Sequence, residues 1–201
     1  MKNIKKCLFL FFPLLIVLVS PKILLGSDRS TFPTSRMGGG TRGLCGSRLI
    51  MHIVPVENKY TPDKTRLLAM YLGKTKEAKP LTVEIINNSQ IEQKLNFEPS
   101  GEALFIFKIQ SIENTSLWKS YFNCSDIQSD NMINFMSNIS NPVSTLISTE
   151  SNLEQKKYQR FINKAHNKCG TTITNEEIKN LTSLDEAISS KISENVSIIC
   201  P

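Results

Sequence analysis

The hydrophobic positions follow three different patterns along the chain. An apolar run from Cys7 to Val19, broken only by Pro13, stands near the start. Short apolar runs separated by turn residues fill the middle of the chain, and this pattern is typical of β-strands. Toward the end, apolar residues recur at helical spacing. The three patterns predict a leader segment, a β domain and a helical tail.

The middle of the chain contains six runs that predict strands. Turn residues separate several of them, as in Asn87-Asn88-Ser89 and Pro99-Ser100-Gly101. Short strands in such close succession favour an antiparallel sandwich or barrel. The fold class expected is therefore mainly β, with a small antiparallel β-sandwich-like domain followed by a helical C-terminal tail. The predicted strands cover residues 48–54, 66–72, 81–86, 91–97, 103–109 and 117–124.

The tail predicts two helical stretches. Ser151 can cap a helix that runs to about Lys168 and ends at Gly170. Thr174 and Glu177 have the spacing of a capping box for a second stretch. The apolar faces consist of Tyr158, Phe161, Ile162 and Ala165 in the first, and of Leu181, Leu184, Ala187, Ile188 and Ile192 in the second.

The N-terminal segment predicts export. Three lysines precede the apolar run and no acid accompanies them, which is typical of a secretory signal. We expect cleavage near Gly26 or Ser27. An uncleaved anchor is the alternative, because the stretch from Leu8 to Leu25 approaches the length that spans a bilayer. The expected organisation is a signal peptide (1–26), a lead-in (27–37), a β-sandwich-like domain (38–125), a linker (126–150) and a helical tail (151–201).

The net charge changes once the signal is set aside. The chain has 24 bases and 18 acids, and four of the bases lie in residues 1–26, which leaves 20 against 18 and a net charge of +2. A chain so close to neutral gives no basis for nucleic-acid binding. One helix face carries a row of bases that predicts either a solvated surface or a weak contact with a membrane surface. These bases are Lys156, Arg160, Lys164 and Lys168.

The cysteines also fit an oxidising compartment. Removing Cys7 with the signal leaves Cys45, Cys124, Cys169 and Cys200, an even number. Four cysteines permit three connectivities, and the sequence alone does not choose among them. We favour Cys45–Cys124 and Cys169–Cys200, because each pair then lies within one compositional half of the chain.

Two motifs near the start of the β domain suggest chemistry, but each lacks a required part. Residues 38–43 fit G-x-G-x-x-G, yet a dinucleotide site needs a strand before the motif and a helix after it. Here a polar segment precedes it and a predicted strand follows. Cys45-Gly46-Ser47 is similar to the papain signature, but Arg48 occupies the position of the nucleophilic cysteine.

The chain has two histidines, His52 and His166, and each is a candidate metal ligand or general base. His166-x-x-Cys169 has the spacing of two metal ligands on one helix turn, with Cys124 or Cys200 as a further ligand. Because oxidised cysteines do not bind metals, we assign no metal, cofactor or catalytic residue. His52 lies within a predicted strand and is expected to be a core or edge residue whose hydrogen bonds are satisfied.

Two elements of the chain are shared with a known group of proteins. The first is Gly39-Gly40-Thr41-Arg42-Gly43-Leu44-Cys45, followed by an apolar stretch that ends in Val54-Pro55. The second is Leu117-Trp118-Lys119-Ser120-Tyr121-Phe122-Asn123-Cys124. Over about residues 36–125 the chain resembles an exported cyanobacterial family classed as a domain of unknown function. The resemblance implies a β-sandwich-like exported domain, a bacterial source and a Cys45–Cys124 bridge, and it implies no activity.

The sequence therefore favours an exported periplasmic or cell-envelope protein that acts as a binding or structural module. Its expected partner is an envelope protein or a glycan, recognised by surface contacts. An envelope hydrolase or a thiol-active enzyme using Cys45 or His166 is one alternative. A membrane-tethered accessory factor with an uncleaved N-terminal anchor is another.

Overall fold

Two β-sheets form the centre of the computed structural model, which describes residues 37–38, 48–75, 78, 80–123, 141–148, 151–184 and 186–201. In sheet A the strand order is β1 (Met37–Gly38), β2 (Ile50–His52), β4 (Leu67–Leu72), β7 (Ala103–Lys108), β11 (Asn195–Ile199) and β10 (Thr172–Thr174). In sheet B the order is β3 (Lys59–Tyr60), β9 (Val143–Leu146), β8 (Ser116–Phe122), β5 (Leu81–Asn87) and β6 (Gln90–Phe97).

The mainly β class is confirmed. Strands hold 39% of the described residues and helices 19%. Each of the six runs predicted from the sequence coincides with a strand of the structure, from β2 to β8. The sheets are mixed rather than purely antiparallel, because β11 pairs parallel to β7 and β3 pairs parallel to β9.

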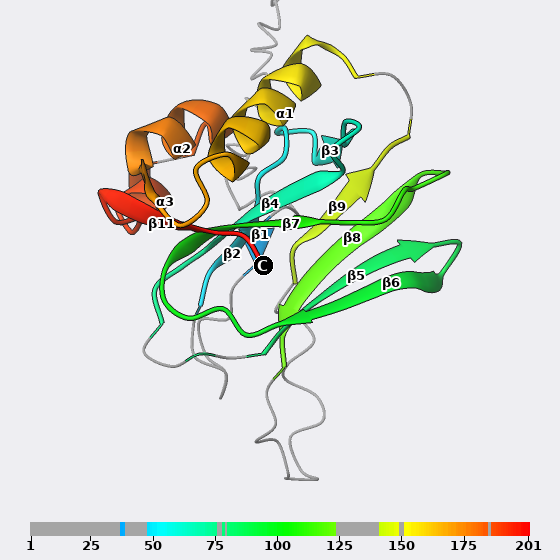
Figure 1. The fold of residues 1–201 in the computed structure, drawn as a ribbon, viewed down its shortest axis with the longest axis horizontal. Helices are drawn as coiled ribbons and strands as arrows, with labels where there is room; N and C mark the ends of the chain where they lie inside the picture. Colours follow the sequence, from blue (N-terminus) through cyan, green and yellow to red (C-terminus); the bar gives the residue numbers. More distant parts are fainter. Residues whose placement is uncertain are drawn as a thin grey trace, which may run out of the picture. The chain divides into compact units, whose positions relative to one another are not determined.

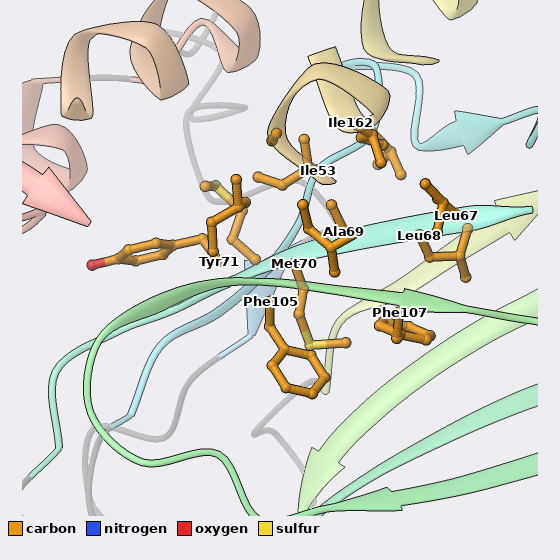
Figure 2. Packing of buried hydrophobic residues seen from close by; sticks show 14 of the residues in the cluster. Ile53, Leu67, Leu68, Ala69, Met70, Tyr71, Phe105, Phe107 and Ile162 are labelled. Carbon is orange, nitrogen blue, oxygen red and sulfur yellow. The ribbon is translucent and has the colours of Figure 1, made fainter. Parts of the chain in front are cut away.

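Sheet A is the middle of three layers. The helices α1 (Leu153–His166), α2 (Asn175–Thr182) and α3 (Glu186–Ser189) gather on one face of it, and sheet B lies on the other (Figure 1). Every residue of β4 is buried, as expected for a strand that is covered on both faces. Met70 and Phe105 point toward sheet B, whereas Ala69 lies on the side of Ile162 from α1 (Figure 2).

Aromatic rings fill the space between the two sheets. Phe97 of β6 meets Phe105 and Phe107 of β7, with ring centroids 4.9 and 5.6 Å apart. Phe107 also meets Trp118 of β8 edge to face at 5.9 Å. The Phe97–Phe105 and Phe107–Trp118 pairs are edge to face, which suits the charge distribution of aromatic rings, and Phe97–Phe107 is tilted. All three pairs join one sheet to the other.

The tail contains strands as well as helices, which corrects the sequence-based expectation. β10 and β11 extend sheet A, and Ser197 of β11 pairs with Ala103 of β7. All described residues also belong to one compact unit. The predicted boundary at 126–150 therefore does not separate a β part from an appended tail, because both share sheet A and its core.

The helix ends follow the capping signals closely. The Thr174 side chain accepts a hydrogen bond from the Glu177 N–H, as the capping box predicts. Ser151 was predicted to cap α1, but Asn152 does so by accepting from the Gln155 N–H at 2.8 Å. The second stretch divides into α2 and α3 because Ser183 adopts a left-handed conformation, with φ of 49°.

The predicted signal peptide, most of the lead-in and most of the 126–150 linker lie outside the described residues. Among the helices that are described, none combines the length and the apolar content needed to cross a membrane.

Candidate binding site

His52 lies at the centre of a buried hydrogen-bond chain that joins the two sheets. Its ring stacks on Trp118 with centroids 3.6 Å apart. Its Nε2 lies 2.9 Å from Ser120 Oγ, and its Nδ1 lies 2.8 Å from Ser144 Oγ. The Trp118 indole N–H donates to Ser120, and Ser144 donates to Asn58 Oδ1.

The donor and acceptor roles in these hydrogen bonds determine which nitrogen of the His52 imidazole carries the proton. Ser144 uses its single proton toward Asn58, so its oxygen accepts from Nδ1–H of His52. Nε2 then accepts the proton of Ser120. The neutral Nδ1–H form satisfies every member of the chain, and burial lowers the pKa of His52 well below its ordinary value of 6.5.

This serine–histidine arrangement is structural rather than catalytic. The side chains of His52, Ser120 and Ser144 are all 0% exposed, so a substrate cannot reach them. The sequence-based expectation of a core histidine with satisfied hydrogen bonds agrees with this geometry. The serines that surround it come from β8 and β9, and no sequence motif links them to His52.

Arg48 connects loops at the ends of several strands. Its guanidinium donates to the carbonyl oxygens of Gly73 and Pro99 at 3.0 and 2.9 Å, and also to that of Gly101. Its Cζ atom lies 5.0 Å from the centre of the Phe122 ring. Arg48 is only 5% exposed, and burial lowers its pKa. The residue therefore acts as a buried clamp, a role that the sequence did not indicate.

An open hollow of about 380 Å³ lies where the segments after β3, β7 and β9 meet. Its size falls in the range of small-ligand sites. Ile109, Ile112 and Ile147 supply the apolar part of the lining. The polar part comes from Asp63, Lys64, Arg66, Gln110, Ser111 and Ser148.

The walls of the hollow are held by hydrogen bonds. Asp63 accepts from Asn163 Nδ2 of α1 at 2.6 Å and from the Thr65 N–H at 2.9 Å. Partial burial works to raise the pKa of Asp63, but these hydrogen bonds outweigh it and lower the pKa. The Arg66 carbonyl accepts from the Ile109 N–H at 3.0 Å, which joins the first two walls.

The hollow carries two exposed cations. Lys64 and Arg66 are solvent-exposed, and neither forms an ion pair with a carboxylate in the part of the chain that the structure describes. Arg66 also holds a left-handed backbone, with φ of 57°, which is unfavourable for a residue other than glycine. Non-glycine residues in such conformations are concentrated at functional sites. We therefore take this hollow as the candidate binding site.

Sequence reasoning did not find this site because its walls are distant in the chain. Residues 62–66, 109–112 and 147–148 come together only through the pairing of the strands that precede them. The one local signal is the polar Asp63-Lys64-Thr65-Arg66 run between two buried strands.

Among the predicted site residues, Cys169 and Cys200 form a disulfide with their Cα atoms 5.8 Å apart. Cys45 and Cys124 lie outside the described residues. His166 is exposed beside the disulfide. The predicted basic row is solvent-exposed throughout, although its last residue, Lys168, lies beyond the end of α1, and Lys164 pairs with Glu177 at 3.1 Å.

Non-reducing peptide mapping of the purified chain is expected to give a 169–200 bridge and a 45–124 bridge. Arg48 and Phe122 are in contact, and they stand three residues after Cys45 and two before Cys124. This contact between described neighbours of the two cysteines favours the Cys45–Cys124 pairing that the sequence predicts. The same experiment should place the mature N-terminus near Ser27. Any bridge between Cys45 and either tail cysteine would contradict this prediction.

Comparisons of the chain with protein-family models, curated proteins and solved structures give no match. The resemblance to the exported cyanobacterial family therefore stays a prediction, and the candidate site rests on the geometry of this chain alone.

Proposed function

We propose that this chain is an exported cell-envelope binding protein and that the hollow beside Arg66 takes an acidic, hydroxyl-rich ligand such as an acidic glycan. The observation that carries this proposal is the pair of exposed cations over a partly apolar lining, neither of which is paired with a carboxylate among the described residues. Export is supported by the basic and apolar pattern of residues 1–26 and by the Cys169–Cys200 disulfide.

Apart from the Asp63 carboxylate, which already accepts hydrogen bonds from Asn163 and Thr65, the lining matches the groups that an acidic saccharide presents. Arg66 and Lys64 offer charge-assisted hydrogen bonds to a carboxylate. Gln110, Ser111 and Ser148 offer donors and acceptors for hydroxyl groups. Ile109 and its apolar neighbours can contact the C–H face of a sugar ring. A hollow of about 380 Å³ accommodates a short saccharide rather than a folded partner.

A titration of the mature chain tests this proposal. A uronic-acid oligosaccharide is expected to bind, and a neutral oligosaccharide of equal length is expected to bind much more weakly. Lys64→Glu should reduce the affinity by about tenfold or more, because a charge-assisted hydrogen bond is replaced by repulsion. Lys191→Glu makes the same change in net charge on the exposed turn after α3 and should leave the affinity unchanged.

Arg66→Gly separates binding from stability. Glycine relieves the left-handed backbone cost but adds freedom to the unfolded chain, so the free energy of unfolding should change by less than about 1 kcal/mol. Binding of the uronate should nevertheless weaken, because the cation is lost. Equal binding by the Lys64→Glu and Lys191→Glu variants, or equal affinity for the neutral oligosaccharide, would overturn the proposed function.

A further inference from the structure

Three side chains with metal-binding atoms meet at the C-terminal end of α1. They are His166, Cys169 and Cys200, and their ligand atoms all lie within 4.8 Å of one another. His166 and Cys169 are exposed and Cys200 is partly exposed, so an ion in solution can reach them. The cluster is separate from the hollow, because none of its members lines that cavity.

The backbone brings this cluster together independently of the disulfide. The Gly170 N–H donates to the Ile198 carbonyl at 2.9 Å, and the Ile198 N–H donates to the Thr171 carbonyl at 2.8 Å. These bonds hold the turn after α1 against β11. The Cys169 N–H also donates to the His166 carbonyl at 3.2 Å, which fixes the spacing within that turn. Cys169 and Cys200 therefore remain neighbours when the bond between them is broken.

We propose that the reduced chain binds Zn²⁺ through the two cysteine thiolates and the imidazole of His166. Two thiolates and one imidazole form a ligand set that zinc uses in proteins, with water in the fourth position. Ligand atoms bound at the usual zinc distances of about 2.0–2.3 Å lie roughly 3.5–4 Å apart. The two sulfur atoms, bonded to each other in the oxidised chain, therefore have to separate on reduction, and they can do so while all three ligand atoms stay within the 4.8 Å that they span now.

Conversion of the oxidised chain to the zinc-bound chain takes two steps, reduction of the disulfide and then metal binding. A dithiol reductant transfers two electrons and two protons to the Cys169–Cys200 disulfide, which gives two thiols and an oxidised, cyclic dithiol. Zn²⁺ then displaces both thiol protons into the solvent and accepts a lone pair from neutral His166. In the oxidised chain the same sulfur atoms are bonded to each other and bind no metal, so occupancy of the site reports the redox state of the disulfide.

The surrounding charges allow a cation at this position. The site lies at the C-terminal end of α1, where the helix dipole places partial negative charge. Lys164, in the last turn of the helix, is already paired with Glu177. Lys168 is adjacent to Cys169 in the sequence, and the charge of −2 on two thiolates outweighs its single positive charge.

Cobalt provides the probe, because Co²⁺ bound by thiolates gives charge-transfer bands and the visible bands of a tetrahedral ion. The full chain is reduced with a phosphine under argon and titrated with Co²⁺, and Zn²⁺ is then added to displace it. The reduced chain should develop these bands and the oxidised chain should not. His166→Ala should weaken Co²⁺ binding by at least about tenfold, the lower end of what a lost metal-site partner costs.

Asn167→Ala is the matched control. Asn167 is exposed and follows His166 directly, and its replacement removes no metal ligand. It should bind Co²⁺ as the unaltered chain does. This comparison also removes any contribution from the remaining cysteines, which both variants retain. Equal cobalt affinity of His166→Ala and Asn167→Ala would overturn the proposal, as would a reduced chain without thiolate-to-cobalt bands.

Trp118 fluorescence shows whether the reduced chain is folded during the titration. If it unfolds without metal, Zn²⁺ is added during refolding. Recovery of the Trp118 signal by the unaltered chain and by Asn167→Ala, but not by His166→Ala, would support the zinc site. Failure of Zn²⁺ to restore the signal of the unaltered chain, or equal recovery by His166→Ala, would overturn it.

Discussion

Acidification is expected to weaken the fold well above the range in which carboxyl groups titrate. The pKa of buried His52 lies well below the ordinary 6.5, so below pH 6.5 the unfolded chain binds a proton that the folded chain does not. The contribution of neutral His52 to the free energy of unfolding is therefore complete above pH 6.5 and is lost as the pH falls. The free energy of unfolding should decrease by about 1.4 kcal/mol for each pH unit below that value.

Urea unfolding followed by fluorescence measures this decline. The chain has one tryptophan, Trp118, and it stacks directly on His52. His52→Gln should lose about 2–4 kcal/mol at neutral pH, because it opens a gap beside Trp118 and leaves a buried serine without its partner. It should also lose most of the decline between pH 6.5 and 5. His166→Gln keeps the buried imidazole and should keep the decline. If the His52→Gln variant lost as much stability between pH 6.5 and 5 as the unaltered chain, the decline would not come from His52.

The partly buried carboxylates Asp63 and Glu102 titrate at lower pH and do not contribute to this decline. Partial burial works to raise the pKa of Asp63 and of Glu102, but hydrogen bonds to each carboxylate outweigh it and lower both values. Their stabilisation is present above their ordinary pKa values of 3.8 and 4.5 and is lost only as the pH falls below them. The decline above pH 5 is therefore that of His52.

Replacement of Arg48 by methionine is expected to destabilise the fold by about 3–5 kcal/mol. Methionine fills part of the volume but donates no hydrogen bonds. The carbonyl oxygens of Gly73, Pro99 and Gly101 would each lose a charged donor, and Phe122 would lose the cation over its ring. A buried acceptor left without a partner costs about 1–3 kcal/mol, and the three loops can partly relax toward water.

The same urea measurement tests Arg48, with Arg160→Met as its control. Arg160 is exposed on α1, and its side chain donates to the Lys156 carbonyl of the same helix, so its loss should cost less than about 0.5 kcal/mol. Arg48→Lys should lie between the two, because an ammonium group cannot reach three carbonyls in a planar fork. A loss for Arg48→Met no larger than that for Arg160→Met would show that the clamp does not stabilise the fold.

The sequence predicted the strands well where their signal is local. β5 and β6 alternate or carry runs of β-branched residues, and the Asn88-Ser89 turn between them has both residues at positive φ, as a two-residue hairpin requires. The apolar runs of β4 and β7 are too short for helices and end at turn residues. The capping box of α2 was predicted for the same reason, because all its members lie within four residues.

The strands of the tail show what local signals omit. β10 has three residues, and β11 has only two buried positions, Val196 and Ile198. Alone, neither segment is a recognisable strand. β11 is a strand because Ile198 pairs with Leu104, more than ninety positions earlier in the chain. The pairing partner, and not the propensity of the segment, determines the structure there.

The sequence by itself determined the mainly β class, the positions of the longer strands, the helices of the tail and the pattern expected of an exported chain. Tertiary structure alone decided that the tail completes sheet A, that His52 is enclosed between two serines, and that Lys64 and Arg66 line one hollow with Ile109. The physical reason is range. Periodicity and capping act within a few residues, whereas burial and the assembly of a site depend on strand pairing across the whole chain.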